Sequence, residues 1–295
     1  MPQESFAAGG GARTNAMSVD VEEHFQVSAM DGVVARADWP HLPSRVVRNT
    51  ERILETFARS GVRATFFILG VVAQRHPELV RRIVAEDHEV ASHGYAHWRI
   101  TQQDPESFRS DVRRTKALLE DIGGVRVRGY RAASFSLTQE TDWAHAILEE
   151  EGYSYSSSIY PIRHDHYGAP DAPRFPYHPN AGSAFQEIPI TTVEYGARRL
   201  PCGGGGFFRL LPYGVSTAWM KRVNRRENSP CVFYFHPWEI DPDQPRVAGL
   251  SRRTRFRHYV GLRRMHSRLE RLADAFAWDR MDRVFALDSK PSDPR

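Results

Sequence analysis

The segment 92–98, SHGYAHW, contains two histidines, His93 and His97, four positions apart. Imidazole nitrogens are common ligands of divalent transition metals, and on a helix this spacing would place both rings on one face. The same pair also fits two histidines on the polar face of a helix. Because Gly94 rather than glutamate follows His93, the HExxH pattern of zinc proteases is missing. A metal site would therefore need a third ligand from another segment.

Carboxylates that could supply this ligand occur in the segment DVEEH, where Val21 separates Asp20 from Glu22. Residues two apart in a strand point to the same side, so both carboxylates can face one pocket. Two imidazoles and one carboxylate leave coordination positions open for water and substrate, as in catalytic zinc sites. A solvated acidic turn is the alternative interpretation of this segment.

Two further polar residues follow short apolar segments, namely Arg131 in RGYRAASFS and His236 in FYFHPWE. Taken alone, Arg131 fits a surface arginine, and His236 fits a buried structural histidine as well as a catalytic one. With the carboxylates and the histidine pair they form a set that could bind a metal and transfer protons.

The elements that must position this set alternate between strand and helix. We expect strands within 17–25, 63–70, 89–94 and 229–240, and helices at 44–61, 76–88, 104–124 and 138–152. This order predicts a parallel sheet covered by helices, in a barrel or partial barrel whose chemistry lies at the carboxyl ends of the strands. A long loop is expected from about 161 to 215, a basic helix at about 251–277 and a last strand near DRVFALD.

Composition indicates one globular domain rather than a nucleic-acid-binding or membrane-spanning protein. The 295 residues carry 40 Lys+Arg against 36 Asp+Glu, and 41% are hydrophobic. No segment approaches the roughly 20 apolar residues that span a bilayer, and 1–16 lacks the features of a secretory signal. We therefore predict a cytoplasmic protein with a flexible tail at 1–16, one domain at 17–288 (core motifs 17–240, extension 241–288) and a tail at 289–295.

Together these motifs resemble the polysaccharide deacetylases of carbohydrate esterase family 4, the NodB-homology enzymes, over residues 17–288. The order is the same: an acidic pair, HxxxH, an arginine motif and a late histidine. The segments SVDVEEHFQV, SSSIYPIRHDHYG and GGGGFFRLLPY look most like the deacetylases of exosortase (PEP-CTERM) exopolysaccharide loci. The resemblance implies an α/β fold, a distorted (β/α)7-type barrel in a single domain with a long inserted loop region and a C-terminal helix.

The resemblance also implies an activity, the hydrolysis of N-acetyl groups on amino sugars of an exopolysaccharide or its precursor. It gives Asp20 as catalytic base, Arg131 as its orienting partner, His236 as general acid and the backbone N–H of Ser134 as oxyanion donor. It implies a divalent metal, Zn²⁺ before Co²⁺ or others, on Glu22, His93 and His97. The residues expected to line the groove for a polysaccharide or oligosaccharide are His164, Asp165, His166, Tyr167, Gly205, Phe207 and Trp238.

The sequence also departs from the family pattern. Val21 separates two acidic residues that are commonly adjacent, Gly94 replaces a usual Ser or Thr, and Ala133 replaces a usual proline. The acidic residue that supports the late histidine is left open among Glu194, Asp165 and Glu239. Two other functions stay open, a hydrolase of small cyclic amides or imides on the same fold and a non-catalytic carbohydrate-binding barrel.

Overall fold

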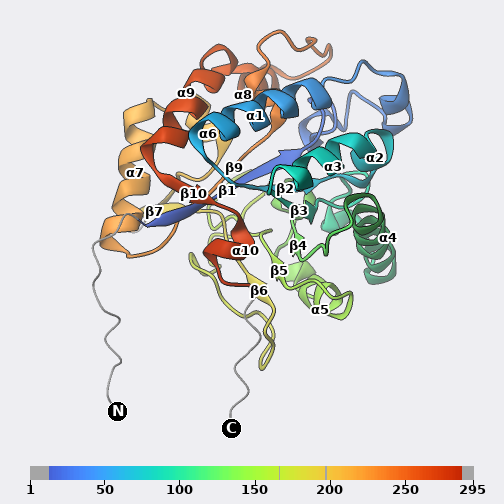
Figure 1. Ribbon diagram of the computed structural model, residues 1–295, viewed down its shortest axis with the longest axis horizontal. Coiled ribbons are helices and arrows are strands. Elements are labelled where there is room, and N and C mark those ends of the chain that lie inside the picture. Colours follow the sequence, from blue (N-terminus) through green and yellow to red (C-terminus); the bar gives the residue numbers. More distant parts are fainter. Residues whose placement is uncertain (1–12, 166, 197, 288–295) are drawn as a thin grey trace.

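A curled parallel sheet surrounded by helices makes up the computed structural model, which describes residues 13–165, 167–196 and 198–287 (Figure 1). In this part of the chain the sheet has eight strands. They run in the order β10 (Ala277–Asp279), β1 (Thr14–Val21), β2 (Thr65–Ile68), β3 (Glu89–Ser92), β4 (Gly129–Tyr130), β5 (Tyr155–Ser156) and β6 (Gln186–Glu187), with β9 (Val232–Phe235) also paired to β1. The strands β7 (Thr192–Tyr195) and β8 (Arg198–Pro201) form a separate antiparallel hairpin.

Every strand pair of the large sheet is parallel, which confirms the predicted α/β barrel. Between β6 and β9 irregular backbone continues the wall. The Gly203 N–H donates to the carbonyl of Thr191 at 3.0 Å, and the Tyr234 N–H donates to the carbonyl of Gly203 at 2.8 Å. A Cβ on Gly203 would lie 2.3 Å from the carbonyl oxygen of Val232. Only glycine therefore allows the backbone to approach β9 closely at this position.

Helices cover the outside of the sheet (Figure 1). They are α1 (Val46–Ser60), α2 (Gly70–Arg75), α3 (Pro77–Ala85), α4 (Pro105–Gly123), α5 (Ala144–Glu150), α6 (Gly205–Leu210), α7 (Tyr213–Arg226), α8 (Arg252–Tyr259), α9 (Leu262–Ala275) and α10 (Met281–Val284). In α1, for example, Ile53, Leu54 and Phe57 are fully buried against the sheet, and Gly61 ends the helix in a left-handed conformation. None of the helices in the described ranges is long and apolar enough to span a bilayer.

The register aligns the carboxyl ends of neighbouring strands in one row. This row runs through Val21, Ile68, Ser92 and Tyr130. On β9, Phe235 lies opposite Val19 of β1. The residues that follow these ends, among them His93, Arg131 and His236, therefore emerge at the same edge of the barrel.

Side chains alternate along β1 as the period of a strand requires. Met17, Val19 and Val21 belong to the apolar core that extends to the outer helices, whereas Ser18 and Asp20 contact a buried arginine inside the barrel. Asp20 is only 2% exposed. A buried carboxylate needs hydrogen-bonding or ionic partners, so the alternation of β1 already demands a polar network inside this barrel.

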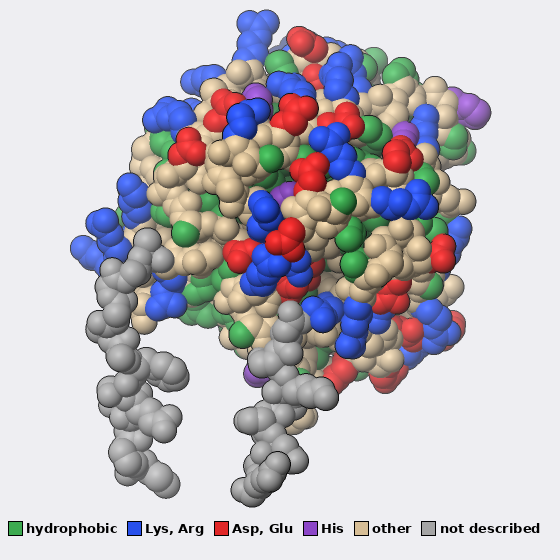
Figure 2. Space-filling model, viewed as in Figure 1, with side chains coloured by type: hydrophobic (Ala, Val, Ile, Leu, Met, Phe, Trp, Pro, Cys, Tyr) green, Lys and Arg blue, Asp and Glu red, His purple; other side chains and the backbone are tan. Residues whose placement is uncertain are grey.

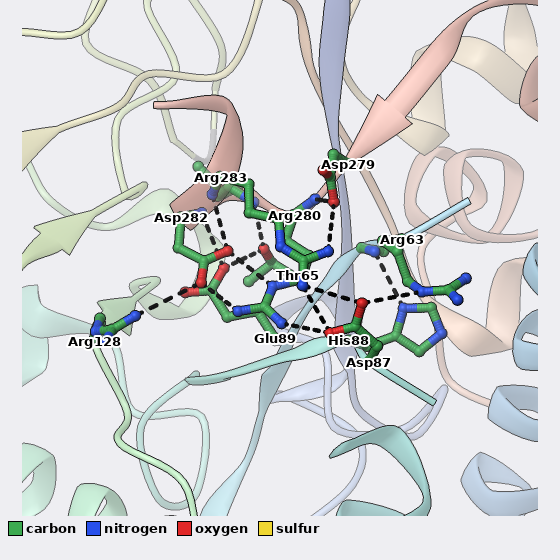
Figure 3. Close-up of polar contacts among 12 residues, drawn as sticks. Arg63, Thr65, Asp87, His88, Glu89, Arg128, Asp279, Arg280, Asp282 and Arg283 are labelled. Atoms are coloured by element: carbon green, nitrogen blue, oxygen red, sulfur yellow. Dashed lines mark hydrogen bonds and ion pairs between the residues drawn. The ribbon is translucent and has the colours of Figure 1, made fainter. Parts of the chain in front are cut away.

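Polar contacts hold the opposite, amino end of the strands to the C-terminal segment (Figure 3). Thr65 and Glu89 begin β2 and β3, and the Thr65 hydroxyl donates to Glu89 at 2.5 Å while accepting from the Met281 N–H at 2.8 Å. Arg280 donates to both carboxylate oxygens of Asp282, which is 1% exposed. This network holds α10 against the amino end of the strands, at the edge of the barrel opposite to their carboxyl ends.

Four of the predicted elements differ in the structure. The loop expected from about 161 to 215 contains β6, β7, β8 and α6, so only part of it is a loop. Strand β1 begins at Thr14, so the predicted tail at 1–16 ends too late; residues 14–16 pair with β10. The basic helix expected at 251–277 is two helices, because Gly261 breaks it in a left-handed conformation (φ 72°). The expected last strand at 282–288 is wrong, since Met281–Val284 is helical and 277–279 forms β10 instead. Residues 1–12 and 289–295 of the predicted tails, and residue 288 of the predicted domain, lie outside the described residues.

Candidate active site

A cavity of about 630 Å³ opens at the carboxyl edge of the sheet. Five of the residues predicted to carry chemistry line it, namely Asp20, Glu22, His93, His97 and His236. Arg131 lies behind them, fully buried, in contact with Asp20. The fold thus brings together the whole set that the sequence motifs single out.

Glu22, His93 and His97 form a group able to hold a metal ion, with one ligand atom of each within 4.8 Å of the others. Oε2 of Glu22 lies 3.2 Å from Nε2 of His97 and 4.0 Å from Nε2 of His93. All three side chains are buried, and no hydrogen bond within the described ranges reaches either carboxylate oxygen of Glu22. Oε1 of Glu22 lies 3.3 Å from Nε2 of His236. A buried carboxylate without a hydrogen bond in this part of the chain, facing the two imidazole nitrogens of His93 and His97, is the donor set that a divalent cation satisfies.

The backbone around the two histidines fixes their orientation. Nδ1–H of His93 donates to the carbonyl of Arg131 at 2.8 Å, which leaves the lone pair of Nε2 for the cluster. The strand expected at 89–94 ends at Ser92 as β3, and the segment that carries His93 and His97 is a loop, in which His97 has a φ of 54°. Arg36 holds this loop by donating to the carbonyls of Ala96 and His97 at 3.1 Å each. Tertiary contacts, not helical spacing, bring the two rings together.

The protonation of this cluster also suits a cation. Burial lowers the pKa of His93, and it lowers that of His97 further, so both imidazoles are neutral at pH 7 and free to coordinate. Burial raises the pKa of Glu22 to about 8. A divalent cation between these residues would offset that burial by stabilising the carboxylate form.

Asp20 is held by a buried ion pair. Nη1 of Arg131 lies 2.6 Å from Oδ1 of Asp20 and also donates to the Ser18 hydroxyl at 2.9 Å. The other guanidinium nitrogens donate to the carbonyl and hydroxyl of Ser157, both at 3.0 Å. These bonds aim Oδ2 of Asp20 at the cavity, 3.9 Å from Nε2 of His236. The expected orienting role of Arg131 has the geometry it needs.

His236, whose side chain is 19% exposed at the cavity, is held by two buried residues, Glu239 and Arg209. Its Nδ1 lies 2.8 Å from Oε1 of Glu239, and Oε2 of Glu239 accepts from Nε of Arg209 at 2.6 Å. Arg209 is 2% exposed and donates to the carbonyl of His258 at 3.0 Å. Sequence reasoning missed Arg209, although a single arginine within the apolar segment GFFRLL is a usable signal of a buried ionic partner.

The electrostatics of these three residues favour a protonated histidine. Burial opposes the charge on His236, but the hydrogen bond to Glu239 and the charge of Glu22 outweigh it and raise the pKa of His236 to about 9. Burial likewise opposes the charge on Glu239, yet Arg209 and the His236 hydrogen bond lower the pKa of Glu239 to about 2. At neutral pH the imidazolium can therefore donate a proton from Nε2 into the cavity.

The structure decides between the three acidic residues left open as the support of the late histidine. Glu239 makes the contact. Asp165 instead pairs with Arg257 at 3.0 Å, and Glu194 pairs with Arg199 at 3.1 Å on the β7–β8 hairpin.

Ser134 lies at the cavity wall after β4, in a short turn whose backbone is unusual. Ser134 and Phe135 have φ values of 52° and 49°. The Ser134 hydroxyl hydrogen-bonds with that of Ser28 at 2.6 Å, which ties the turn to the loop after β1. A non-glycine residue in the left-handed region is held there by its surroundings, so this turn is a fixed part of the wall.

The residues predicted for the sugar groove divide into two groups. His164, Tyr167, Phe207 and Trp238 line the cavity. Asp165 and Gly205 are not among the lining residues. A Cβ on Gly205 would lie 2.4 Å from Oε1 of Glu239, so this glycine makes room for the carboxylate behind His236, and Gly206 reaches the cavity instead. His166 lies outside the described residues.

Comparison with protein families divides the chain into two consecutive segments. Residues 38–155 match the polysaccharide deacetylase family, and residues 157–286 match a domain of unknown function, DUF3473. His93, His97 and Arg131 lie in the first segment, and Arg209, His236 and Glu239 lie in the second, whereas Asp20 and Glu22 precede both. The site described above is therefore built from both segments and from the end of β1.

Individual relatives agree with the first of these matches. The chain is 42% identical over 83 residues to a chitooligosaccharide deacetylase of Rhizobium leguminosarum bv. trifolii, which covers 28% of this chain and 39% of the relative. It is 32% identical over 75 residues to a peptidoglycan-N-acetylglucosamine deacetylase of Bacillus cereus, covering 25% of this chain and 27% of the relative. The chain thus spans less than half the length of these relatives.

One solved structure matches over nearly the whole chain. It is that of a presumed polysaccharide deacetylase from Mycobacterium smegmatis, with a TM-score of 0.59 and 20% identity over 99% of this chain and 97% of that one. At this identity the likeness concerns the fold. The family match and the relatives together support the polysaccharide deacetylase family for the segment that carries the histidine pair.

Proposed function

We propose that this protein is a metal-dependent hydrolase that removes N-acetyl groups from amino sugars of a polysaccharide or oligosaccharide. One observation carries the proposal: a three-ligand cluster lies between a carboxylate held by arginine and a histidine held by glutamate. Amide hydrolysis needs this combination, a base for water on one side and an acid for the departing amine on the other. The deacetylases that match this chain support the same reaction class.

Each residue of the site would have a separate role in this reaction. Glu22, His93 and His97 would hold a divalent cation, with Zn²⁺ the best fit to two imidazoles and one carboxylate. Bound there, the cation would supply Lewis-acid polarisation of the amide carbonyl. Asp20, aimed by Arg131, would accept the proton of the attacking water at Oδ2.

His236 would complete the reaction by giving the proton on Nε2 to the amine as the C–N bond breaks, because an amine leaves poorly without a proton. Glu239 keeps the imidazole charged and fixes which nitrogen faces the cavity. The backbone N–H of Ser134, in its fixed turn, would stabilise the negative charge on the carbonyl oxygen.

The volume of the cavity and the residues that line it argue against the two alternative functions. A volume of about 630 Å³ suits a substrate larger than a small cyclic amide or imide. The presence of a complete acid, base and ligand set favours an enzyme over a binding barrel. An exopolysaccharide or its precursor as substrate, membership of the exosortase-associated group and a cytoplasmic location stay predictions.

The test is acetate release from short N-acetylglucosamine oligomers, measured with zinc content by elemental analysis. We expect about one zinc per chain and metal-dependent acetate release, both lost in His93→Ala/His97→Ala. The matched control is His41→Ala/His178→Ala, which removes two histidines outside the cavity. Zinc binding without acetate release would point to another N-acyl substrate, and absence of zinc after reconstitution would refute the metal site.

A further inference from the structure

The cavity reaches well beyond the proposed metal cluster, to a wall formed by α6 and α8. The lining residues of this wall are Gly206, Phe207, Arg209, Leu210, Arg253, Thr254, Phe256, Arg257, His258 and Val260. All lie in the segment that matches the domain of unknown function. The part of the chain that supplies His236 therefore also supplies most of the outer cavity.

Two large apolar side chains of this wall are left exposed. Leu210 is 49% exposed and Phe256 is 58% exposed, although both line the cavity. Apolar side chains that gather at a cavity mouth mark a binding surface more often than scattered ones do. An aliphatic side chain such as Leu210 offers nothing specific to a sugar hydroxyl but packs well against a hydrocarbon chain.

The wall formed by α6 and α8, called the rim from here on, is also strongly basic. α8 has the sequence RRTRFRHY, with Arg252, Arg253, Arg255 and Arg257 and no acidic residue, whereas basic and acidic side chains are interspersed on the face shown in Figure 2. Asp165 offsets part of this charge by pairing with Arg253 at 2.9 Å and Arg257 at 3.0 Å. Arginine is the side chain best suited to bind phosphate oxygens.

We propose that the substrate is an N-acetylamino sugar carried on a lipid through a phosphate group. The sugar would enter the cavity towards Glu22 and His236, the phosphate would meet the arginines of α8, and the lipid chain would lie over Leu210 and Phe256. This proposal rests on the proposed function and specifies its substrate class. An acidic polysaccharide would use the arginines but would leave the apolar rim exposed to water, so the rim favours the lipid.

The test is binding to phosphatidylcholine vesicles, followed by sedimentation and without turnover. Three sets of vesicles are compared: phosphatidylcholine alone, with phosphatidylglycerol, or with N-acetylglucosamine joined through phosphate to a long isoprenyl chain, the last two at equal charge. We expect binding at least tenfold tighter to the glycolipid vesicles than to either other set. Equal binding to the phosphatidylglycerol vesicles would show a general membrane surface and overturn the proposal, as would no binding to any set.

Variants test whether the rim is responsible. Arg253→Gln/Arg257→Gln, the two arginines of α8 that line the cavity, and, separately, Leu210→Ser/Phe256→Ser should each weaken glycolipid binding at least tenfold while the thermal unfolding midpoint stays within a few degrees. The matched control is Arg225→Gln/Arg226→Gln, an exposed pair in the last turn of α7, which should bind like the parent. Loss in the control, or no loss in the apolar variant, would contradict the proposal. Because binding is measured without catalysis, failure of acetate release would refute the proposed function alone.

Discussion

Nδ1 of His236 lies 2.8 Å from Oε1 of Glu239, and the glutamate is in turn anchored by Arg209. Glu239 and Arg209 both come from the segment after residue 157, whereas His93 and His97 come from the segment before it. The carboxylate of Glu239 explains why the half-buried imidazole of His236 can stay protonated at neutral pH.

Replacing Glu239 by glutamine should move the pH dependence of acetate release. The pKa of His236 is raised to about 9, so its acid form is lost as the pH rises through that value and kcat/KM should fall there. Without the charge of Glu239 the pKa of His236 falls, and the alkaline limb of kcat/KM should move to lower pH, with about a tenfold loss or more at neutral pH.

The control for this change is Glu194→Gln, on the β7–β8 hairpin, where the carboxylate pairs with Arg199. It should leave the alkaline limb in place. If Glu239→Gln shows the parent's pH profile, His236 is not the acid or Glu239 does not set its pKa.

Gly205 and Gly206 offer a matched pair of substitutions at neighbouring positions. A Cβ on Gly205 would lie 2.4 Å from Oε1 of Glu239 and 2.8 Å from Cβ of Phe235, whereas a Cβ on Gly206 meets nothing within 4 Å. Gly205→Ala should therefore displace the carboxylate and shift the alkaline limb as Glu239→Gln does. Gly206→Ala should keep the parent's limb. Equal pH profiles for the two alanine variants would count against the packing described for Gly205.

Asp20→Asn should separate catalysis from metal binding. Asparagine keeps the size of the side chain and one oxygen for Arg131 but cannot accept the proton from water. We expect kcat to fall by about 10²–10⁴-fold with the zinc content unchanged, as measured by acetate release and elemental analysis. Wild-type kcat in this variant would show that another group is the base.

His88 gives a stability prediction away from the site. Its Nδ1 accepts from the Ala64 N–H at 3.1 Å, and burial lowers its pKa from 6.5 to about 4. Between these values the unfolded chain binds a proton that the folded chain does not, so the free energy of unfolding should decrease as the pH falls from 6.5 towards 4.

The measurement is urea unfolding at about pH 7 and about pH 5, where this residue alone contributes a loss of about 2 kcal/mol. His88→Gln removes the titration but keeps an acceptor, so its loss over the same interval should be smaller by that amount. His41→Gln, an exposed position, serves as control and should lose as much as the parent. The same pH sensitivity in His88→Gln would exclude His88 as a source.

Much of the site could be predicted because strand periodicity and element order determine it. Asp20 points into the barrel because it alternates with apolar neighbours on β1, and Arg131 and His236 follow the ends of short apolar strands. In parallel sheets such ends share one edge, so their proximity follows from the alternation of strands and helices.

The rest depends on contacts between distant segments. The loop of His97 owes its conformation to Arg36, and no local pattern reveals that contact. Glu239 could be named but not chosen, because the direction of a side chain in the short turn after β9 depends on Arg209 arriving from α6. The break between α8 and α9 follows from Gly261, where a Cβ would lie 2.6 Å from the carbonyl oxygen of Arg209.

The most direct test of the central claim is a crystal of the zinc-reconstituted protein measured at the zinc absorption edge. We expect one strong anomalous peak within about 2–2.3 Å of Oε2 of Glu22 and Nε2 of both His93 and His97. No peak at this position, or zinc bound elsewhere in the chain, would contradict the metal-dependent mechanism.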